Sequence, residues 1–181
     1  MTATSPIRIE RWTPEPSTAA EEIAMLGDVL RACVYAGASV SFILPFSNDD
    51  ANAFWKNKVF PAVESGSCRV LVARSEGRIV GTVQLDLATP PNQPHRAEVR
   101  KLLVHPSVRR RGIARALMLA IEEEAGAAGR DLLTLDTTTG GYAELLYRSL
   151  GYTTVGLIPR YSLKVDSREL DPTTVMYKSL V

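Results

Sequence analysis

Three consecutive arginines at positions 109–111 stand between an apolar segment, Leu102 to Val104, and a helical pattern that runs from Gly112 to Ala125. The first amide groups of a helix have no partner within the helix, and they carry the positive end of its dipole. A glycine at that point removes the Cβ that would keep an oxyanion at a distance. The pattern predicts an anion site suited to a phosphate group, although an arginine run alone would also suit a solvated surface.

Familiar nucleotide-binding loops and metal sites do not fit the sequence. No Gly-Lys-Ser or Gly-Lys-Thr follows the arginines, and the G-x-G-x-x-G fingerprint is absent. The chain has two cysteines, Cys33 and Cys68, and two histidines, His95 and His105, without a CxxC pair or a histidine cluster. We therefore expect no metal, and no Cys-His or Ser-His-Asp catalytic set can be assigned.

The elements that must position the anion loop alternate between strands and helices. Period-two patterns and apolar runs predict strands at 7–12, 68–74, 79–87, 97–104, 132–136, 153–157 and 174–177. Helices are expected from a cap at Ser17 to Gly37, from a cap at 48–50 to a kink or an end at Pro61, at 112–125 and at 142–150. Because a helix joins the strands at 97–104 and 132–136, part of the sheet is parallel. The fold class is α/β with a mixed sheet and helices on both faces.

Length and charge limit the classes of protein that the chain can represent. Its 181 residues and 19.8 kDa predict one domain over 1–181. A net charge of +1, from 21 basic and 20 acidic residues, argues against a global field for nucleic acid or for an anionic membrane. No apolar run reaches the roughly 18 residues of a membrane span. The first residues, MTATSPIRIERW, lack the apolar region of a secretory signal. A reduced, cytoplasmic protein is expected.

Two segments resemble motifs of the GCN5-related N-acetyltransferase (GNAT) superfamily. Arg109-Arg-Arg-Gly-Ile-Ala114 resembles its Q/R-x-x-G-x-G/A motif, and Leu145-Leu-Tyr-Arg-Ser-Leu-Gly-Tyr152 resembles the later motif in which a helical tyrosine precedes a Gly-aromatic pair. The likeness covers 7–180 by element order and 97–152 by residue pattern. It implies a central, mostly antiparallel sheet with one splayed parallel pair, and acetyltransferase activity with acetyl-CoA as co-substrate. Segments 96–103 and 133–137 are similar to the tabtoxin-resistance type of acetyltransferase.

The resemblance also implies where acetyl-CoA would bind. Amides of the anion loop would hold its pyrophosphate, and its pantetheine arm would pair with the apolar strand, which must then splay from the strand that ends at Asp136. The implied cofactor-binding residues are Leu102, Leu103, Val104, Arg109, Arg110, Arg111, Gly112, Ile113, Ala114 and Arg115. One position departs from the family, because many members carry an asparagine where this chain has Gly140.

Two carboxylates are candidates for the base that deprotonates an acceptor amine. The spacing of Glu98 to the glycine of the anion loop resembles that of the catalytic glutamate in histone-type members, whereas a salt bridge with Arg96 or Arg100 is the alternative. In tabtoxin-resistance-type enzymes an acid at the place of Asp136 works with the glutamate through ordered water, whereas an Asx cap of the next turn is the alternative. The sequence leaves open whether one or both act as base.

Tyr147 matches the tyrosine that serves as general acid in the family, where it protonates the leaving thiolate. Its alternative role is packing in the core beside Leu146 and Leu150. With no nucleophile assigned, direct transfer from acetyl-CoA to a primary amine of a small molecule or peptide is the expected reaction. The expected partners are thus acetyl-CoA and an amine, with no nucleic acid and no membrane, and a homodimer is suggested at the level of the family.

Two other functions compete with this interpretation. A GNAT-fold regulator could bind acyl-CoA without catalysis, but the joint presence of Glu98, Asp136 and Tyr147 argues against it. A nucleic-acid binder is disfavoured because no second basic stripe accompanies the arginines. The acceptor side is expected to be lined by 36–46, by the second helix with Phe54 and Trp55, and by 160–162, although the sequence suits a core role for any of them equally well.

Overall fold

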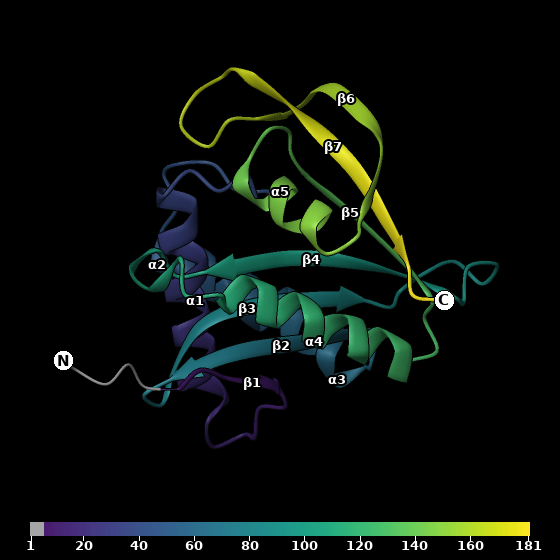
Figure 1. Cartoon of the computed structure of the whole chain (residues 1–181). Coiled ribbons are helices and arrows are strands. Elements are labelled where there is room, and N and C mark those ends of the chain that lie inside the picture. The colour runs from purple at the N-terminus through teal and green to yellow at the C-terminus, as the bar shows by residue number, and fades with distance from the viewer. Residues whose placement is uncertain (1–5) are drawn as a thin grey trace.

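The computed structural model describes residues 6–181. The start of the N-terminal segment that lacks the apolar region of a secretory signal, Met1 to Ser5, lies outside the described residues. The strands and helices alternate in the expected order (Figure 1). The strands are β1 (Arg8–Arg11), β2 (Cys68–Ser75), β3 (Arg78–Asp86), β4 (Arg96–Val104), β5 (Leu132–Thr138), β6 (Thr153–Leu163) and β7 (Leu170–Ser179). The α-helices are α1 (Ala19–Tyr35), α2 (Asn48–Phe54), α3 (Phe60–Glu64), α4 (Ile113–Ala127) and α5 (Tyr142–Ser149), with a π-helical segment at Trp55–Val59 and a 3-10 turn at Pro106–Val108.

Within residues 6–181, seven strands form one sheet in the order β1-β2-β3-β4-β5-β7-β6. Among these strands the single parallel pair is β4 with β5, and every other neighbouring pair is antiparallel. Helix α4 provides the crossover that this parallel pair requires. The expected mostly antiparallel sheet with one parallel pair is therefore confirmed.

Helices cover both faces of the sheet because the strands alternate their apolar side chains between two cores. In β2, Leu71 and Ala73 pack in a core with residues of α4 and α5, whereas Val70 and Val72 pack in a core with α1 and Trp55. Each face thus buries its own apolar cluster. No helix within residues 6–181 combines the length and the apolar character that a membrane crossing would need.

The ends of the first two helices differ from the expected caps. Thr18, rather than Ser17, precedes α1 and makes no side-chain cap bond. Ser47 caps α2 through a reciprocal capping box with Asp50. Pro61 does not simply end this helix, because the turn before it widens to a π-helical form. A proline lacks the N–H of a regular helix and clashes with the carbonyl one turn earlier, and the wider turn relieves that conflict.

The C-terminal hairpin is longer than expected, since β6 and β7 extend far beyond 153–157 and 174–177. Gly156 and Pro159 break the alternation in the sequence, and the register between the strands shifts near both residues. Strand β6 lies at the edge of the sheet, where a proline is tolerated because no outer strand needs its N–H. The sequence pattern therefore predicted only those parts of the two strands in which the apolar and polar residues alternate regularly.

Candidate functional site

Strands β4 and β5 pair only at their beginnings and then part. Their ladder runs from Arg96–Leu132 to Glu98–Thr134, while β4 continues to Val104 and β5 continues to Thr138. Figure 1 shows the two strands diverging from this shared start. Beyond Glu98 the backbone of β4 therefore has a sheet partner on the β3 side alone. The splay that a strand-like ligand would require is present.

The anion loop has an unusual backbone at the head of α4. Arg110 and Gly112 take left-handed φ angles of 65° and 77°, on either side of Arg111. Gly112 is the N-cap, and the first helical bond closes from the N–H of Ala116 to the Gly112 carbonyl. Backbone turns of alternating hand and free helix-start amides both form concavities that bind anions. A Cβ built on Gly112 would meet no protein atom within 4 Å, so the space above the loop is open.

Three arginine side chains of the loop contact other parts of the protein, which the run of arginines in the sequence does not suggest. Arg109 turns toward the strand end, where its Nε donates to the Val104 carbonyl at 3.1 Å and its Nη2 contacts the Cys33 sulfur at 3.7 Å. Arg115 donates to Ser149 Oγ at 2.7 Å. Arg110 lies 5.5 Å from the ring centre of Tyr142. The backbone amides and the helix dipole, rather than these three side chains, are thus the groups of this loop most free to face an anion.

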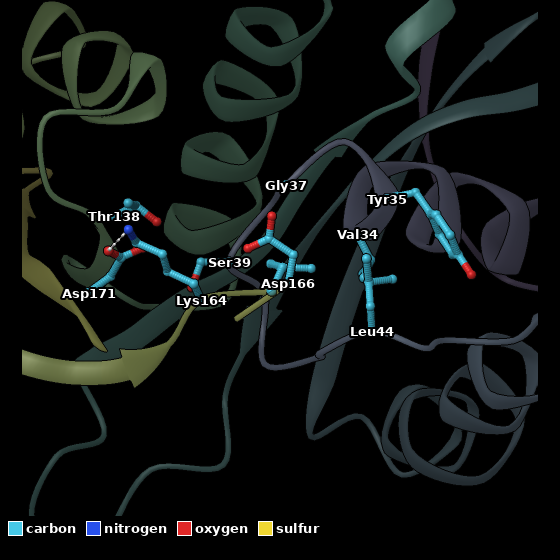
Figure 2. A pocket seen from close by; sticks show the side chains of 10 residues that line it. Val34, Tyr35, Gly37, Ser39, Leu44, Thr138, Lys164, Asp166 and Asp171 are labelled. Atoms are coloured by element: carbon cyan, nitrogen blue, oxygen red, sulfur yellow. Dashed lines mark ion pairs between the residues drawn. The ribbon is translucent and has the colours of Figure 1, made fainter. Parts of the chain in front are cut away.

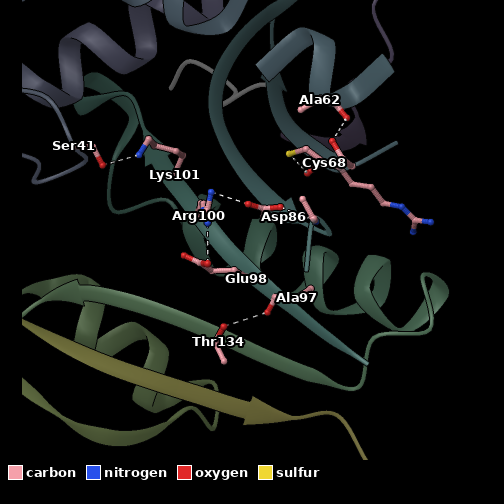
Figure 3. Close-up of polar contacts among 12 residues, drawn as sticks. Ser41, Ala62, Cys68, Asp86, Ala97, Glu98, Arg100, Lys101 and Thr134 are labelled. Atoms are coloured by element: carbon pink, nitrogen blue, oxygen red, sulfur yellow. Dashed lines mark hydrogen bonds and ion pairs between the residues drawn. The ribbon is translucent and has the colours of Figure 1, made fainter. Parts of the chain in front are cut away.

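Glu98 projects from β4 toward the α1 side of the sheet, opposite to the buried Ala97 and Val99. Its Oε2 accepts a hydrogen bond from Arg100 at 2.9 Å, and the same guanidinium pairs with Asp86 at 2.7 Å (Figure 3). The expected alternative, a salt bridge with Arg100, is thus formed. The ion pair fixes the orientation of a carboxylate that remains partly accessible.

Asp136 does not cap a turn, because β5 continues through it to Thr138. Its Oδ2 accepts from the hydroxyl of Thr173, a buried residue of β7, at 2.9 Å. Asp136 shares a face with Thr134, the register partner of Glu98, so both carboxylates lie on the α1 side. Strand geometry puts their Cα atoms about 8 Å apart or more, which suits a link through water rather than a direct hydrogen bond.

Tyr147 lies on α5 in the opposite core, where its side chain is only 6% exposed. Its ring packs against Tyr152 with 5.7 Å between ring centres. Burial raises the pKa of the Tyr147 hydroxyl, and the negative charge of Asp136 raises the pKa further. Tyr147 therefore packs in the core as the alternative proposed, and it also lies within electrostatic reach of Asp136.

Gly140, the departure from the family motif, has a left-handed φ of 76°. Its N–H donates to Glu144 Oε2 at 2.7 Å, which ties the loop to the first turn of α5. A left-handed residue at this point favours glycine.

A cavity of about 260 Å³ opens between the segment after α1 and the β6–β7 hairpin (Figure 2). Thr138 lines the cavity and lies two residues after Asp136 on β5, so the two side chains share one face of the strand. Its lining residues are Val34, Tyr35, Gly37, Ser39, Leu44, Thr138, Lys164, Val165, Asp166 and Asp171. The expected segment 36–46 thus contributes to a cavity whose wall includes Thr138, two residues beyond Asp136 on β5.

The structure divides the residues expected at the acceptor side between the core and the cavity wall, and it adds others. Trp55 is fully buried and packs edge to face against Trp12, so it belongs to the core. Ser162 touches the cavity wall through a 3.5 Å contact with Ser39. The hairpin residues Lys164 and Asp166 were not anticipated, because a polar turn between two strands has no pattern that distinguishes a cavity wall from a solvated loop.

Residues 66–154 match the family model described as acetyltransferase (GNAT) domain. The chain is 35% identical over 114 residues to an uncharacterized N-acetyltransferase of Azospirillum brasilense, covering 61% of this chain and 65% of that relative. It is 39% identical over 98 residues to human N-acetyltransferase 8B, covering 51% of this chain and 41% of that relative. The chain covers less than two thirds of the length of either relative.

Solved structures share the fold over nearly the whole chain. An N-acetyltransferase from Staphylococcus aureus superposes with a TM-score of 0.79 at 18% identity, covering 98% of this chain and 100% of that one. The yncA protein of Salmonella typhimurium, whose structure includes its cofactor acetyl-CoA, superposes with a TM-score of 0.76 at 19% identity, covering 97% and 94%. At these identities the likeness establishes the fold.

Proposed function

We propose that this chain, whose residues 66–154 match the model of a GNAT acetyltransferase domain, transfers the acetyl group of acetyl-CoA directly to a primary amine of a small molecule or peptide. The observation that carries the proposal is the parting of β4 from β5 beside the open start of α4. One feature offers unpaired strand edge and the other offers unpaired helix amides, so that together they suit a ligand with an amide-rich arm and a phosphate group.

The residues present fit acetyl-CoA. The amides from Arg110 to Arg115 would hold the pyrophosphate, and the open space above Gly112 leaves room for its oxygens. The edge formed by Leu102, Leu103 and Val104 would pair with the pantetheine arm. Acetyl-CoA supplies the acetyl group as a thioester, which an amine can attack without an acyl-enzyme.

Glu98 and Asp136 would remove the proton of the acceptor. An alkylammonium with a pKa near 10 is not a nucleophile at neutral pH, so a base is needed. Both carboxylates lie on the face that borders the cavity, and their separation leaves room for a bridging water. This arrangement supports the resemblance to the tabtoxin-resistance type, in which the two acids act together.

Tyr147 Oη would hold the proton that the departing sulfur takes up. An ordinary tyrosine pKa of about 10 exceeds a thiol pKa of about 8.5, so this transfer is uphill by about 2 kcal/mol, and burial adds to the cost. The charge of Asp136 is one cause of the raised pKa. When Asp136 accepts the amine proton that charge disappears, the pKa of Tyr147 falls, and the hydroxyl becomes a better donor when the sulfur leaves.

The test combines cofactor binding with turnover. Calorimetry should show acetyl-CoA binding, and a thiol-release assay over a diverse panel of primary amines should show amine-dependent turnover, with the acetylated amine identified by mass spectrometry. The intact mass of protein incubated with acetyl-CoA alone should not change if transfer is direct. Acetyl-CoA binding without thiol release for any amine would instead support the regulatory alternative.

A further inference from the structure

Lys101 occupies a bulge in the middle of β4. Between Arg100 and Leu103, two residues of β4 stand opposite one residue of β3, Val83. Lys101 has a left-handed φ of 51°, which is rare for a residue with a side chain. A β-bulge redirects a side chain away from the regular alternation. Here it turns a lysine toward the segment that follows α1.

The ammonium group of Lys101 meets a second strained residue there. Its Nζ donates to Ser41 Oγ at 3.2 Å, and Ser41 also has a left-handed φ, of 76° (Figure 3). The rings of Phe42 and Phe54 lie 5.7 and 5.8 Å from Nζ. Strained residues that converge from distant segments are typical of ligand-binding sites.

The charge of Lys101 has no ionic partner within residues 6–181. Burial lowers the pKa of Lys101 and Arg100 lowers it further, whereas Asp136 and Glu98 act in the opposite direction. Those carboxylates are held elsewhere, Glu98 by Arg100 and Asp136 by Thr173. An ammonium group has three donors, and here a neutral hydroxyl receives one of them. An anionic group on a ligand would stabilise a half-buried cation in this state.

We propose that Lys101 binds a carboxylate on the acceptor, so that the acceptor is an amino acid rather than a simple amine. The inference rests on the proposed function, because it places the acceptor amine beside Glu98 and Asp136. Lys101 lies close enough to influence both carboxylates yet forms an ion pair with neither, which leaves space for a molecule that carries an amine and a carboxylate a few bonds apart. The cavity that begins at Ser39, two residues before Ser41, would receive the remainder of the acceptor.

The test compares common L-amino acids with their α-amides. The amide keeps the shape and loses the charge, and its amine is less basic, so any difference in amine protonation favours the amide. We expect the wild type to have a kcat/KM at least tenfold higher for the acids. Lys101→Gln should reduce this preference about tenfold to a hundredfold through the acceptor KM, with the acetyl-CoA KM unchanged. Lys58→Gln, at an exposed lysine of the π-helical segment, is the matched control and should keep the preference.

Two further measurements separate the explanations. Because burial lowers its pKa, the Lys101 charge is unfavourable in the folded state, so Lys101→Gln should melt at the wild-type temperature or above. A lower melting temperature with equal losses for acids and amides would show that Lys101 only holds the 36–47 segment. Calorimetry of the same acid–amide pairs reports the contact without turnover. Lys101-dependent binding of acids without acetylation would refute the acetyltransferase and support the carboxylate site, whereas acids and amides that bind and react alike would overturn this inference.

Discussion

Gly112 and Gly129 offer a matched pair of substitutions at the two ends of α4. Both residues have a left-handed φ, 77° and 69°, and a Cβ built on either meets no protein atom within 4 Å. Gly112 begins the helix at the proposed pyrophosphate site, and Gly129 follows its end. Alanine should therefore strain the backbone equally at the two positions, by about 1–2 kcal/mol. Only Gly112→Ala introduces a methyl group where a phosphate must approach.

The expected loss of affinity follows from the hydrogen bonds at risk. A methyl group on Gly112 would push phosphate oxygens away from helix-start amides, and a hydrogen bond to a charged group contributes about 1.5–3 kcal/mol. Weakening one such bond corresponds to roughly a tenfold to a hundredfold increase in the Kd for acetyl-CoA. Gly129→Ala should leave that Kd unchanged, while both variants lose similar stability.

The assay is calorimetric titration of acetyl-CoA into both variants at equal protein concentration, with a thermal melt of each. Equal melting temperatures for the two variants, with a loss of acetyl-CoA affinity in Gly112→Ala alone, would locate the pyrophosphate at the start of α4. Equal affinities in the two variants would refute the reasoning and place the cofactor elsewhere.

Three further outcomes follow from the site. Tyr147→Phe should lower turnover about a hundredfold with a melting temperature close to that of the wild type, whereas normal turnover with a lowered melting temperature would assign Tyr147 to the core alone. The Glu98→Gln, Asp136→Asn double variant should be most impaired near pH 7 and recover toward pH 10, where amines deprotonate unaided, and a defect of constant size across that range would contradict the base assignment. Burial raises the pKa of Cys68 to about 12 and also raises the pKa of Cys33. At pH 8 both thiols should therefore react with a disulfide reagent far more slowly than free cysteine, by about a thousandfold for Cys68. Rapid labelling of the native protein would show that the thiols are not buried as described.

The order of the elements and the anion loop could be predicted because their signals are local. The helix crossover required a parallel pair, and that pair is β4 with β5. A glycine at the start of an amphipathic pattern predicted an exposed helix start, and Gly112 is the N-cap of α4. Signals of this kind depend on neighbouring residues, so the sequence displays them directly.

Side-chain partners across the fold could not be predicted in the same way. The bulge that redirects Lys101 depends on the register between β3 and β4, which no local pattern specifies. Arg109 also contacts the sulfur of Cys33, which lies 76 positions away in the sequence. The sequence could not decide the role of Trp55, because an aromatic residue on a helix suits a core or a cleft equally well until the packing of the helix is known.

The parting of β4 and β5 would allow the proposed acid and the proposed bases, which lie on different faces of one sheet, to serve one reaction. Glu98 and Asp136 lie on the α1 side, whereas Tyr147 lies in the core on the α4 side. A continuous sheet would separate these groups by its own backbone. Where the ladder ends after Glu98 and Thr134, that barrier is interrupted, and the charge of Asp136 raises the pKa of Tyr147. The same gap leaves the edge of β4 without a partner beyond Glu98, so in the proposed mechanism the cofactor arm and the two proton-transfer groups would depend on the same splay. Mutations that restored pairing between β4 and β5 should therefore abolish cofactor binding and turnover together.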